Sequence, residues 1–157
     1  MVTSPDSNSS SMLLSEAFYI ETINSFTEQK WSPLLNLIPA IERSLNFGKP
    51  FESIKIAEGL HTFPSWTHSA IVSDFLDIVY EMPIFINFDW VSWDEGSKIA
   101  NDKDFNLDNI DIPTKCKIIT AIVRNDRFCE GALVIAFESG LILKILKSIE
   151  NQLLNGS

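Results

Sequence analysis

Apolar residues recur at helical spacing along four long segments of the chain. Such segments form amphipathic helices, because residues at i, i+3, i+4 and i+7 share one face of a helix. Asp111 directly precedes the third segment and is expected to cap that helix. The pattern therefore predicts a core built mainly from helices. The predicted helices cover residues 12–28, 69–79, 112–123 and 141–153.

A further helical segment follows residue 32 and contains two prolines. Ser32 and Pro33 are typical of an N-cap followed by proline at the first helical position. Pro39 removes an amide from the helix interior, so we expect a kink or two short helices there. Gly48 is placed to end the segment. The predicted apolar face consists of Leu34, Ile38, Ile41 and Leu45.

Two shorter segments have the pattern of strands. Residues 51–64 contain two apolar runs around Glu58-Gly59, which predicts a β-hairpin. Residues 82–88 place apolar side chains at alternate positions, which predicts one short strand paired with the hairpin. The predicted fold class is α+β, mainly α-helical, with about five to six helices and a small two- or three-stranded sheet.

The composition indicates one globular domain. Residues 1–11 are rich in Ser and Asn and predict a disordered tail, whereas residues 12–157 are expected to form a single globular domain. No apolar run is long enough to cross a bilayer, and the N-terminus lacks the basic region of a secretory signal, so no membrane partner is expected. Cys116 and Cys129 give no disulfide framework, which favours a cytoplasmic location.

Negative charge is concentrated in one part of the chain. The net charge is −9, and the segment from Asp74 to Asp111 carries ten carboxylates against Lys98 and Lys103, which is −8. Such a segment repels nucleic-acid phosphates, so no nucleic-acid partner is expected. It could attract a basic protein partner. The simpler interpretation is a solvated face, and the pattern favours it.

Two tryptophans lie within this acidic segment. Asp89 is the expected N-cap of a short helix that carries Trp90 and Trp93 on one face, with Asp94 and Glu95 beside them. In one interpretation the tryptophans anchor the core, as large aromatic side chains usually do. In the other they form an aromatic wall rimmed by Asp89, Asp94 and Glu95, which would suit a cationic ligand or a basic partner.

A charged stretch from residue 124 to 140 lies between two strongly apolar helices. Its two arginines and three carboxylates are Arg124, Asp126, Arg127, Glu130 and Glu138. They could bind a small anion through the arginines and use a carboxylate as acid or base. Alternatively, they form a structural ion network that joins two helices around a turn at Gly131, and we favour this second interpretation. Phe128 is expected to be buried between the helices.

The motifs of common enzymes and metal sites are missing from the sequence. His61 and His68 have no metal-ligand spacing and no cysteine near them, so neither a metal nor a cofactor is predicted. His68 could act as a general base only if Asp89 or Asp94 came close to it. Cys129 follows Arg127 closely, which could activate its thiol, but a small buried residue is the favoured interpretation.

Both unusual stretches match a known family pattern. The matching residues are Phe88-Asp89-Trp90, Trp93-Asp94-Glu95-Gly96 and Arg124-x-Asp126-Arg127-Phe128-x-Glu130-Gly131-x-Leu133-x-x-Ala136-Phe137-Glu138-Ser139-Gly140. On these residues the chain resembles an uncharacterised bacterial family catalogued as domain of unknown function 6508. The resemblance implies a small bacterial protein but no established activity, cofactor or partner. The family pattern often continues with histidine where this chain has Leu141, so chemistry that depended on that histidine is in doubt here.

Three hypotheses of function follow from these observations. The first is a small cytoplasmic regulatory or protein-interaction module whose surface includes residues 74–111. The alternative is a hydrolase- or transferase-like enzyme that binds a small anionic substrate at the cluster of arginines and carboxylates. A third, a member of a toxin–antitoxin or phage-defence pair, rests on size, acidity and the family resemblance alone. The sequence leaves the ligand, the reaction and the oligomeric state open.

Overall fold

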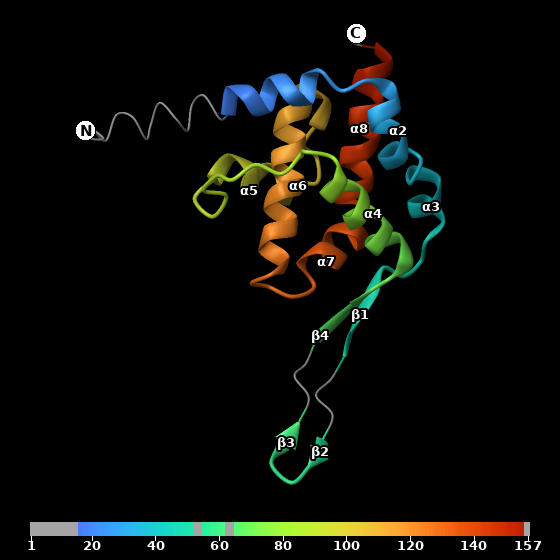
Figure 1. Ribbon diagram of the computed structural model, residues 1–157, viewed down its shortest axis with the longest axis vertical. Helices are drawn as coiled ribbons and strands as arrows, with labels where there is room; N and C mark the ends of the chain where they lie inside the picture. Colours follow the sequence, from blue (N-terminus) through green and yellow to red (C-terminus); the bar gives the residue numbers. More distant parts are fainter. Residues whose placement is uncertain (1–15, 52–54, 62–64, 156–157) are drawn as a thin grey trace, which may run out of the picture.

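The computed structural model describes residues 16–51, 55–61 and 65–155, and the predicted tail lies outside these ranges (Figure 1). The described chain is mainly helical, and residues 16–24 form its first helix. Seven further α-helices follow, slightly more than the sequence predicted. They are α2 (Glu28–Leu35), α3 (Ile38–Arg43), α4 (Ala70–Glu81), α5 (Asp94–Asn101), α6 (Ile112–Asp126), α7 (Ala132–Glu138) and α8 (Leu141–Asn155).

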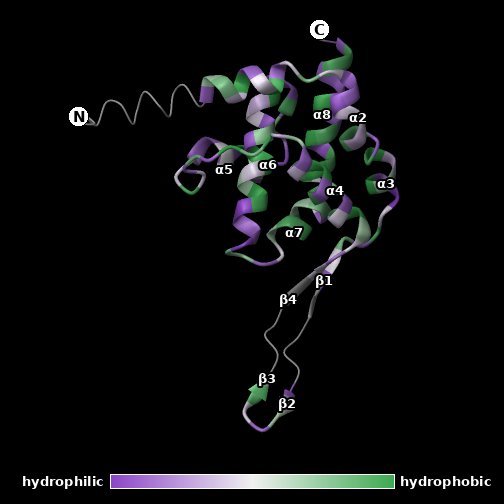
Figure 2. Cartoon of the chain, viewed as in Figure 1, coloured by the Kyte–Doolittle hydropathy of each residue, from purple (hydrophilic) through white to green (hydrophobic). Residues whose placement is uncertain are grey.

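The two longest of these helices, α6 and α8, form the centre of the core. Along both helices hydrophobic and hydrophilic residues alternate, so each can bury one side (Figure 2). On α8 the buried aliphatic residues are Ile142, Ile145, Leu146 and Ile149. Burying each such side chain stabilises the fold by about 1.5–3 kcal/mol. As predicted, Asp111 caps α6, and its Oδ1 accepts a hydrogen bond from the Thr114 amide at 2.9 Å.

The N-terminal helices begin and end differently from the prediction. The described part of the first helix ends at residue 24, and α2 already begins at Glu28 because Thr27 Oγ1 accepts a hydrogen bond from the Lys30 amide at 3.3 Å. The predicted start at Ser32-Pro33 is therefore wrong, and Pro33 lies inside α2. This earlier start places both Trp31 and Leu34 in the core, where they are buried.

Pro39 divides the following segment into two short helices, as predicted. It occupies the first turn of α3, where its missing amide costs no helical hydrogen bond. Ile38 and Ile41 are buried as expected. Leu45 is wrongly predicted, because α3 ends at Arg43 and leaves this side chain fully exposed. Gly48 does not end a helix but begins a strand.

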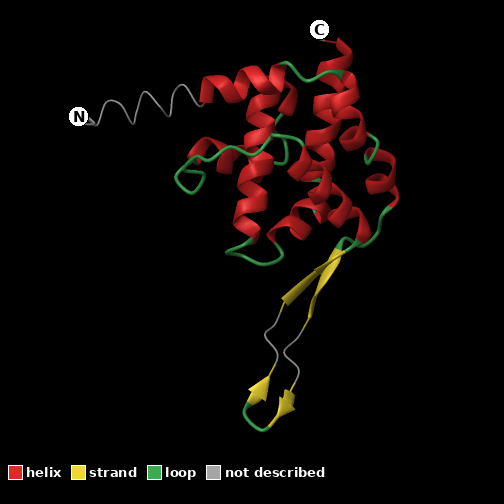
Figure 3. Cartoon of the chain, in the orientation of Figure 1, coloured by secondary structure: helices red, strands yellow, loops and turns green. Residues whose placement is uncertain are grey.

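The predicted hairpin is present and extends beyond the expected residues. Strand β1 (Gly48–Phe51) pairs antiparallel with β4 (Ser65–His68), and β2 (Lys55–Ala57) pairs antiparallel with β3 (Leu60–His61). The chain turns at Glu58-Gly59, where Gly59 has a φ of 72°. The β1–β4 pair projects from the helical body (Figure 3). At its base the Ser69 amide donates to the Phe47 carbonyl at 2.9 Å, directly before α4 begins.

The third strand predicted at residues 82–88 is wrong. These residues form turns and irregular chain, and both sheets of the described residues contain two strands. The alternation arises because Met82 and Ile84 are buried among helices. The Ile84 carbonyl accepts hydrogen bonds from the side chains of Tyr19 and Thr120, the latter at 3.2 Å. Helical side chains therefore satisfy this backbone, where the prediction expected a neighbouring strand.

Candidate functional site

The two tryptophans lie in a turn before α5, and the helix predicted to carry them is absent from the described chain at that point. Asp89 stabilises this turn, since its Oδ1 accepts a hydrogen bond from the Ser92 amide at 3.3 Å. The helix begins at Asp94, with Trp93 as its N-cap residue. A Cβ atom on Gly96 would lie 2.2 Å from the Trp93 ring. The ring therefore packs directly on the first turn of α5, which the spacing of the tryptophans did not reveal.

Trp93 is a structural anchor whose aromatic environment already contains a cation. Its ring packs edge-on against Phe88, with centroids 5.4 Å apart. Lys117 Nζ, from α6, lies 5.9 Å from the centroid of the Trp93 ring and 5.2 Å from that of Phe88. The same amine pairs with Glu16 from the first helix. An external cation at this ring would have to compete with the protein's own lysine.

Trp90, in contrast, is partly buried and lies beside two exposed apolar side chains. Its ring centroid lies 6.0 Å from that of Phe128, whose side chain is 79% exposed. Val91 is 74% exposed. We call Trp90, Val91 and Phe128 the Trp90 cluster. The prediction that Phe128 is buried is wrong. Phe128 lies in the turn at which the chain reverses its direction between α6 and α7.

Two adjoining hollows lie along α6, and the first of them begins at the Trp90 cluster. The first has a volume of about 310 Å³ and lies between Trp90, Trp93, α5 and α6. The second, of about 580 Å³, continues to α7 and the start of α8. We call the two together the α6 groove. The residues that line both hollows are Ala100, Asn101, Ile122 and Asn125. Further lining residues of the second hollow are Asp102, Lys103, Ala132, Ile135, Ala136, Ser139, Leu141 and Lys144.

The five charged residues of the 124–140 stretch do not pair with one another. Among the described residues, no salt bridge joins any two of them. Arg124 is partly buried, with its guanidinium 5.7 Å from the centroid of the Phe85 ring. Arg127, Glu130 and Glu138 are exposed. The expected contact between Arg127 and Glu130 is therefore not among these salt bridges.

Asp126 is the member of this group with defined partners in other elements. Its Oδ1 accepts a hydrogen bond from the Leu133 amide in the first turn of α7 at 3.1 Å. Gly131, the N-cap residue of α7, has a φ of 92° and no side chain to do this. The Oδ2 atom of Asp126 lies 3.7 Å from His68 Nε2 at the end of β4. The structure thus places His68 beside Asp126, whereas the sequence had suggested Asp89 or Asp94.

The cysteines differ in exposure. Cys129 is exposed in the turn between α6 and α7, so the expected burial of its side chain is wrong. Cys116 is buried in α6, and burial raises the pKa of its thiol well above the usual range.

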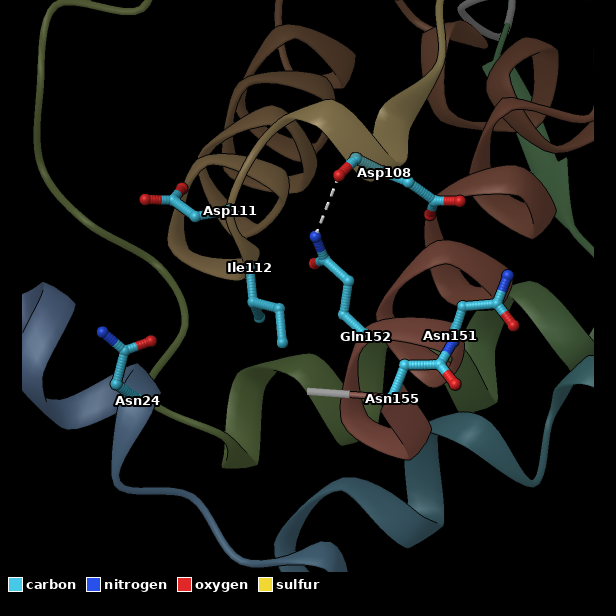
Figure 4. A pocket seen from close by; sticks show the side chains of 7 residues that line it. All are labelled: Asn24, Asp108, Asp111, Ile112, Asn151, Gln152 and Asn155. Carbon is cyan, nitrogen blue, oxygen red and sulfur yellow. Dashed lines mark hydrogen bonds between the residues drawn. The ribbon is translucent and has the colours of Figure 1, made fainter. Parts of the chain in front are cut away.

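A separate pocket of about 440 Å³ lies where the C-terminal part of α8 meets the start of α6. Figure 4 shows Gln152 pointing into it, with its amide nitrogen directed at the Asp108 carbonyl. This nitrogen donates to the carbonyls of Asp108 at 3.3 Å and Ile110 at 2.9 Å. The residues that line the pocket are Asn24, Asp108, Asp111, Ile112, Asn151, Gln152 and Asn155.

Lys115 lies behind this pocket and was not singled out from the sequence. Its side chain is completely buried, and its amine donates to Gln152 Oε1. Burial lowers the pKa of Lys115 to about 8, although the nearby carboxylates of Asp108 and Asp111 oppose the change. Lys115 occupies an inward position of α6. The hydrophobic pattern did not indicate it, because that pattern considers only apolar residues at such positions.

The described residues show neither a cluster of metal ligands nor a helix that could span a membrane. They contain no group of three or more His, Cys, Asp or Glu side chains arranged to hold a metal ion. No helix within the described ranges is long and apolar enough to cross a membrane.

Comparison with known proteins identifies the family. The model of a family of unknown function, DUF6508, matches residues 26–154, which is most of the chain. The chain belongs to this family. The match confirms the resemblance and extends it well beyond the C-terminal half. No curated protein and no solved structure matches the chain. Asp126, Gly131 and Leu133 lie within the matched range and form the turn into α7, where the Leu133 amide donates to Asp126.

Proposed function

We propose that this DUF6508 chain is a small regulatory or protein-interaction module that recognises a basic partner protein. The observation that carries the proposal is the Trp90 cluster, in which the partly buried Trp90 and the exposed Val91 lie beside the exposed Phe128 from a separate part of the chain. Tryptophan is enriched among residues that dominate binding energy at interfaces. Large exposed apolar side chains gathered in one place are typical of interaction sites.

The charge around this cluster supports a basic partner. All ten carboxylates between Asp74 and Asp111 are exposed. Asp89, Asp94 and Glu95 are the closest of them in sequence to Trp90. Carboxylates around an apolar centre give it a negative potential. This potential increases the rate at which a positively charged partner associates and disfavours acidic partners. We extend the proposal to a bacterial cytoplasm, where free thiols such as those of Cys116 and Cys129 persist.

A displayed library of random peptides, selected on the immobilised full-length chain, tests this proposal. We expect the selected peptides to combine Lys or Arg with aromatic or aliphatic residues, and their affinity to fall as salt rises. Trp90→Ala should weaken binding by about tenfold or more. Leu154→Ser is the matched control, because Leu154 is an exposed apolar residue of α8 outside the cluster. Uncharged or acidic peptides that bind independently of salt and of Trp90 would contradict the proposal.

The enzymatic alternative has one observation in its favour. His68 and Asp126 form a partly exposed pair, and Arg127 is exposed directly after Asp126. An arginine beside an imidazole and a carboxylate could hold a small anion near an acid and a base. If this is correct, inorganic phosphate or sulfate should raise the thermal midpoint of the parent chain. Arg127→Ala, at an exposed position, should fold normally and lose that increase, whereas Glu130→Gln, which removes a negative charge at another exposed position, should retain it. An unchanged midpoint in the parent chain would argue against the anion site.

A further inference from the structure

We infer that the α6 groove binds one amphipathic helix of the partner, with its apolar face on α6 and α7 and basic residues at the end that meets the Trp90 cluster. This inference rests on the proposed function and defines the partner segment. The groove continues directly from the Trp90 cluster, since Trp90 and Val91 line its first hollow. A helix bound there would thus extend the proposed interface along the protein surface.

The form of the groove suits a helix. Helix α7 and its C-cap residue line it with Ala132, Ile135, Ala136 and Ser139, which follow the i, i+3, i+4, i+7 spacing of one helical face. Three of these residues are small, so a second helix can approach the α7 backbone closely. Ile135 stands among them and is 55% exposed. Because the residues around it are small, the Ile135 side chain protrudes from this face. It is suited to insert between side chains of an incoming helix.

The sides of the groove are apolar as well. Ile122 of α6 and Leu141 of α8 are both partly buried and lie on opposite sides of α7 in the sequence. Each would lose its remaining contact with water when a helix covers the groove, which favours binding by about 25 cal/mol for each Å² removed from water. Polar groups in the lining, such as Asn101 and Asn125, can accept or donate hydrogen bonds at the margin.

Charge distinguishes the two ends of the groove. At the Trp90 end, α5 carries Asp94 and Glu95 in its first turn, and Asp89 lies in the preceding turn. At the other end Lys103 and Lys144 lie beside Asp102. The Lys144 amine donates to the Lys103 carbonyl at 2.7 Å, so its position is defined. Basic residues of a bound helix are therefore favoured at the Trp90 end and disfavoured at the Lys144 end.

Four synthetic peptides of about 15 residues distinguish apolar docking from charge attraction. Three share a helical leucine face and carry lysines, glutamates or glutamines in one half. The fourth keeps the lysines and replaces each leucine by serine. Each is titrated into the full-length isotope-labelled chain, and amide shifts report the binding site. We expect the Leu/Lys peptide to bind most tightly, followed by Leu/Gln and then Leu/Glu, with shifts at Ile122 and Ile135. The Ser/Lys peptide should bind about tenfold or more weakly than Leu/Lys.

Variants then test the groove itself. Ile135→Glu should weaken the Leu/Lys peptide by about tenfold or more, because it places a charge in the apolar centre of the contact. Leu45 is exposed and precedes β1 in the sequence. The control variant Leu45→Glu should therefore leave binding unchanged.

Equal binding of the Leu/Lys and Ser/Lys peptides, with shifts confined to the Trp90 cluster, would overturn the groove inference and leave the proposed function intact. No lysine-dependent binding at either place would overturn both. A dimer of the chain that Ile135→Glu dissociates would show that a second copy occupies the groove, and this too would overturn the inference.

Discussion

His68 Nε2 lies 3.7 Å from Asp126 Oδ2, and this contact joins the base of the β1–β4 pair to the turn between α6 and α7. The other oxygen of the same carboxylate accepts the Leu133 amide at 3.1 Å. One side chain thus connects a strand end and two helices. The charged residues beside it, Arg127 and Glu130, extend into solvent. We therefore ascribe the structural role that the sequence suggested for the whole charged stretch chiefly to Asp126.

Asp126→Ala should destabilise the fold by about 1–3 kcal/mol, because it leaves the Leu133 amide without its acceptor and removes the partner of His68. Asp126→Asn should cost less, since an amide oxygen can still accept the Leu133 hydrogen. Urea unfolding monitored by circular dichroism measures both. Glu138→Ala, at an exposed position of α7, provides the control and should stay within about 0.5 kcal/mol of the parent. Equal losses for Asp126→Ala and Glu138→Ala would contradict a special role for Asp126.

Lys115→Met should remove a pH dependence of stability. Burial lowers the pKa of Lys115 to about 8 in the folded chain, while an unfolded lysine has its usual value near 10.4. Between these values the unfolded chain binds more protons, so the contribution of Lys115 to stability rises with pH. It is complete above the unfolded pKa and is lost as the pH falls through about 8.

The measurement is the difference in unfolding free energy between the parent and Lys115→Met from pH 7 to pH 10.5. We expect it to change in favour of the parent by up to about 3 kcal/mol across this range. Taking the difference cancels groups common to both chains, including Cys116, whose raised pKa acts in the opposite direction at high pH. Lys98→Met, at an exposed position of α5, should give a flat difference. A flat difference for Lys115→Met as well would show that its amine is hydrated.

Gly96→Ala should destabilise the chain, although alanine normally favours a helix over glycine by about 1 kcal/mol. A Cβ at this position would lie 2.2 Å from the Trp93 ring, so the ring must move away from Phe88 and Lys117. We expect a net loss of about 1–3 kcal/mol and an altered near-ultraviolet circular dichroism spectrum. Ser97→Ala, at the next and exposed position of α5, is the control. In the background Trp93→Ala the cost of Gly96→Ala should largely disappear, and a cost that persists would place the clash elsewhere.

The elements correctly predicted from the sequence are those whose signals are local. Ser69 and Asp111 each accept a hydrogen bond from an amide three residues later, at 3.4 and 2.9 Å, and the helices that follow them carry a clear apolar face. Pro39 separated two helices for an equally local reason. The turn at Glu58-Gly59 depends on a glycine that adopts a positive φ. In each case the deciding interaction lies within a few residues of the signal.

The errors concern interactions between distant parts of the chain. Alternating burial at Met82 and Ile84 has the period of a strand, but its partners are Tyr19 and Thr120 on helices. The contact of His68 with Asp126 could not be inferred, because no local rule brings β4 to the end of α6. The exposure of Phe128 depends likewise on how the turn before α7 faces Trp90. The sequence thus indicated the residues around Trp90 as a candidate surface. The groove beside them could not be predicted, because it forms only where four helices pack together.

Cys129 should react rapidly with a thiol reagent in the folded chain, and Cys116 should not. Cys129 is exposed directly after Phe128, whereas Cys116 is buried in α6 and its raised pKa keeps the thiolate scarce. We expect one fast-reacting thiol in the native chain and two after unfolding. Cys129→Ser should lose the fast thiol, and Cys116→Ser should retain it.

A bulky maleimide on Cys129 lies beside the Trp90 cluster and should also weaken the binding of a lysine-rich peptide there. Methylthiolation adds little volume and should not weaken that binding. Two equally fast thiols in the native chain would mean that α6 opens readily, and unimpaired peptide binding after maleimide labelling would place the partner surface away from Trp90.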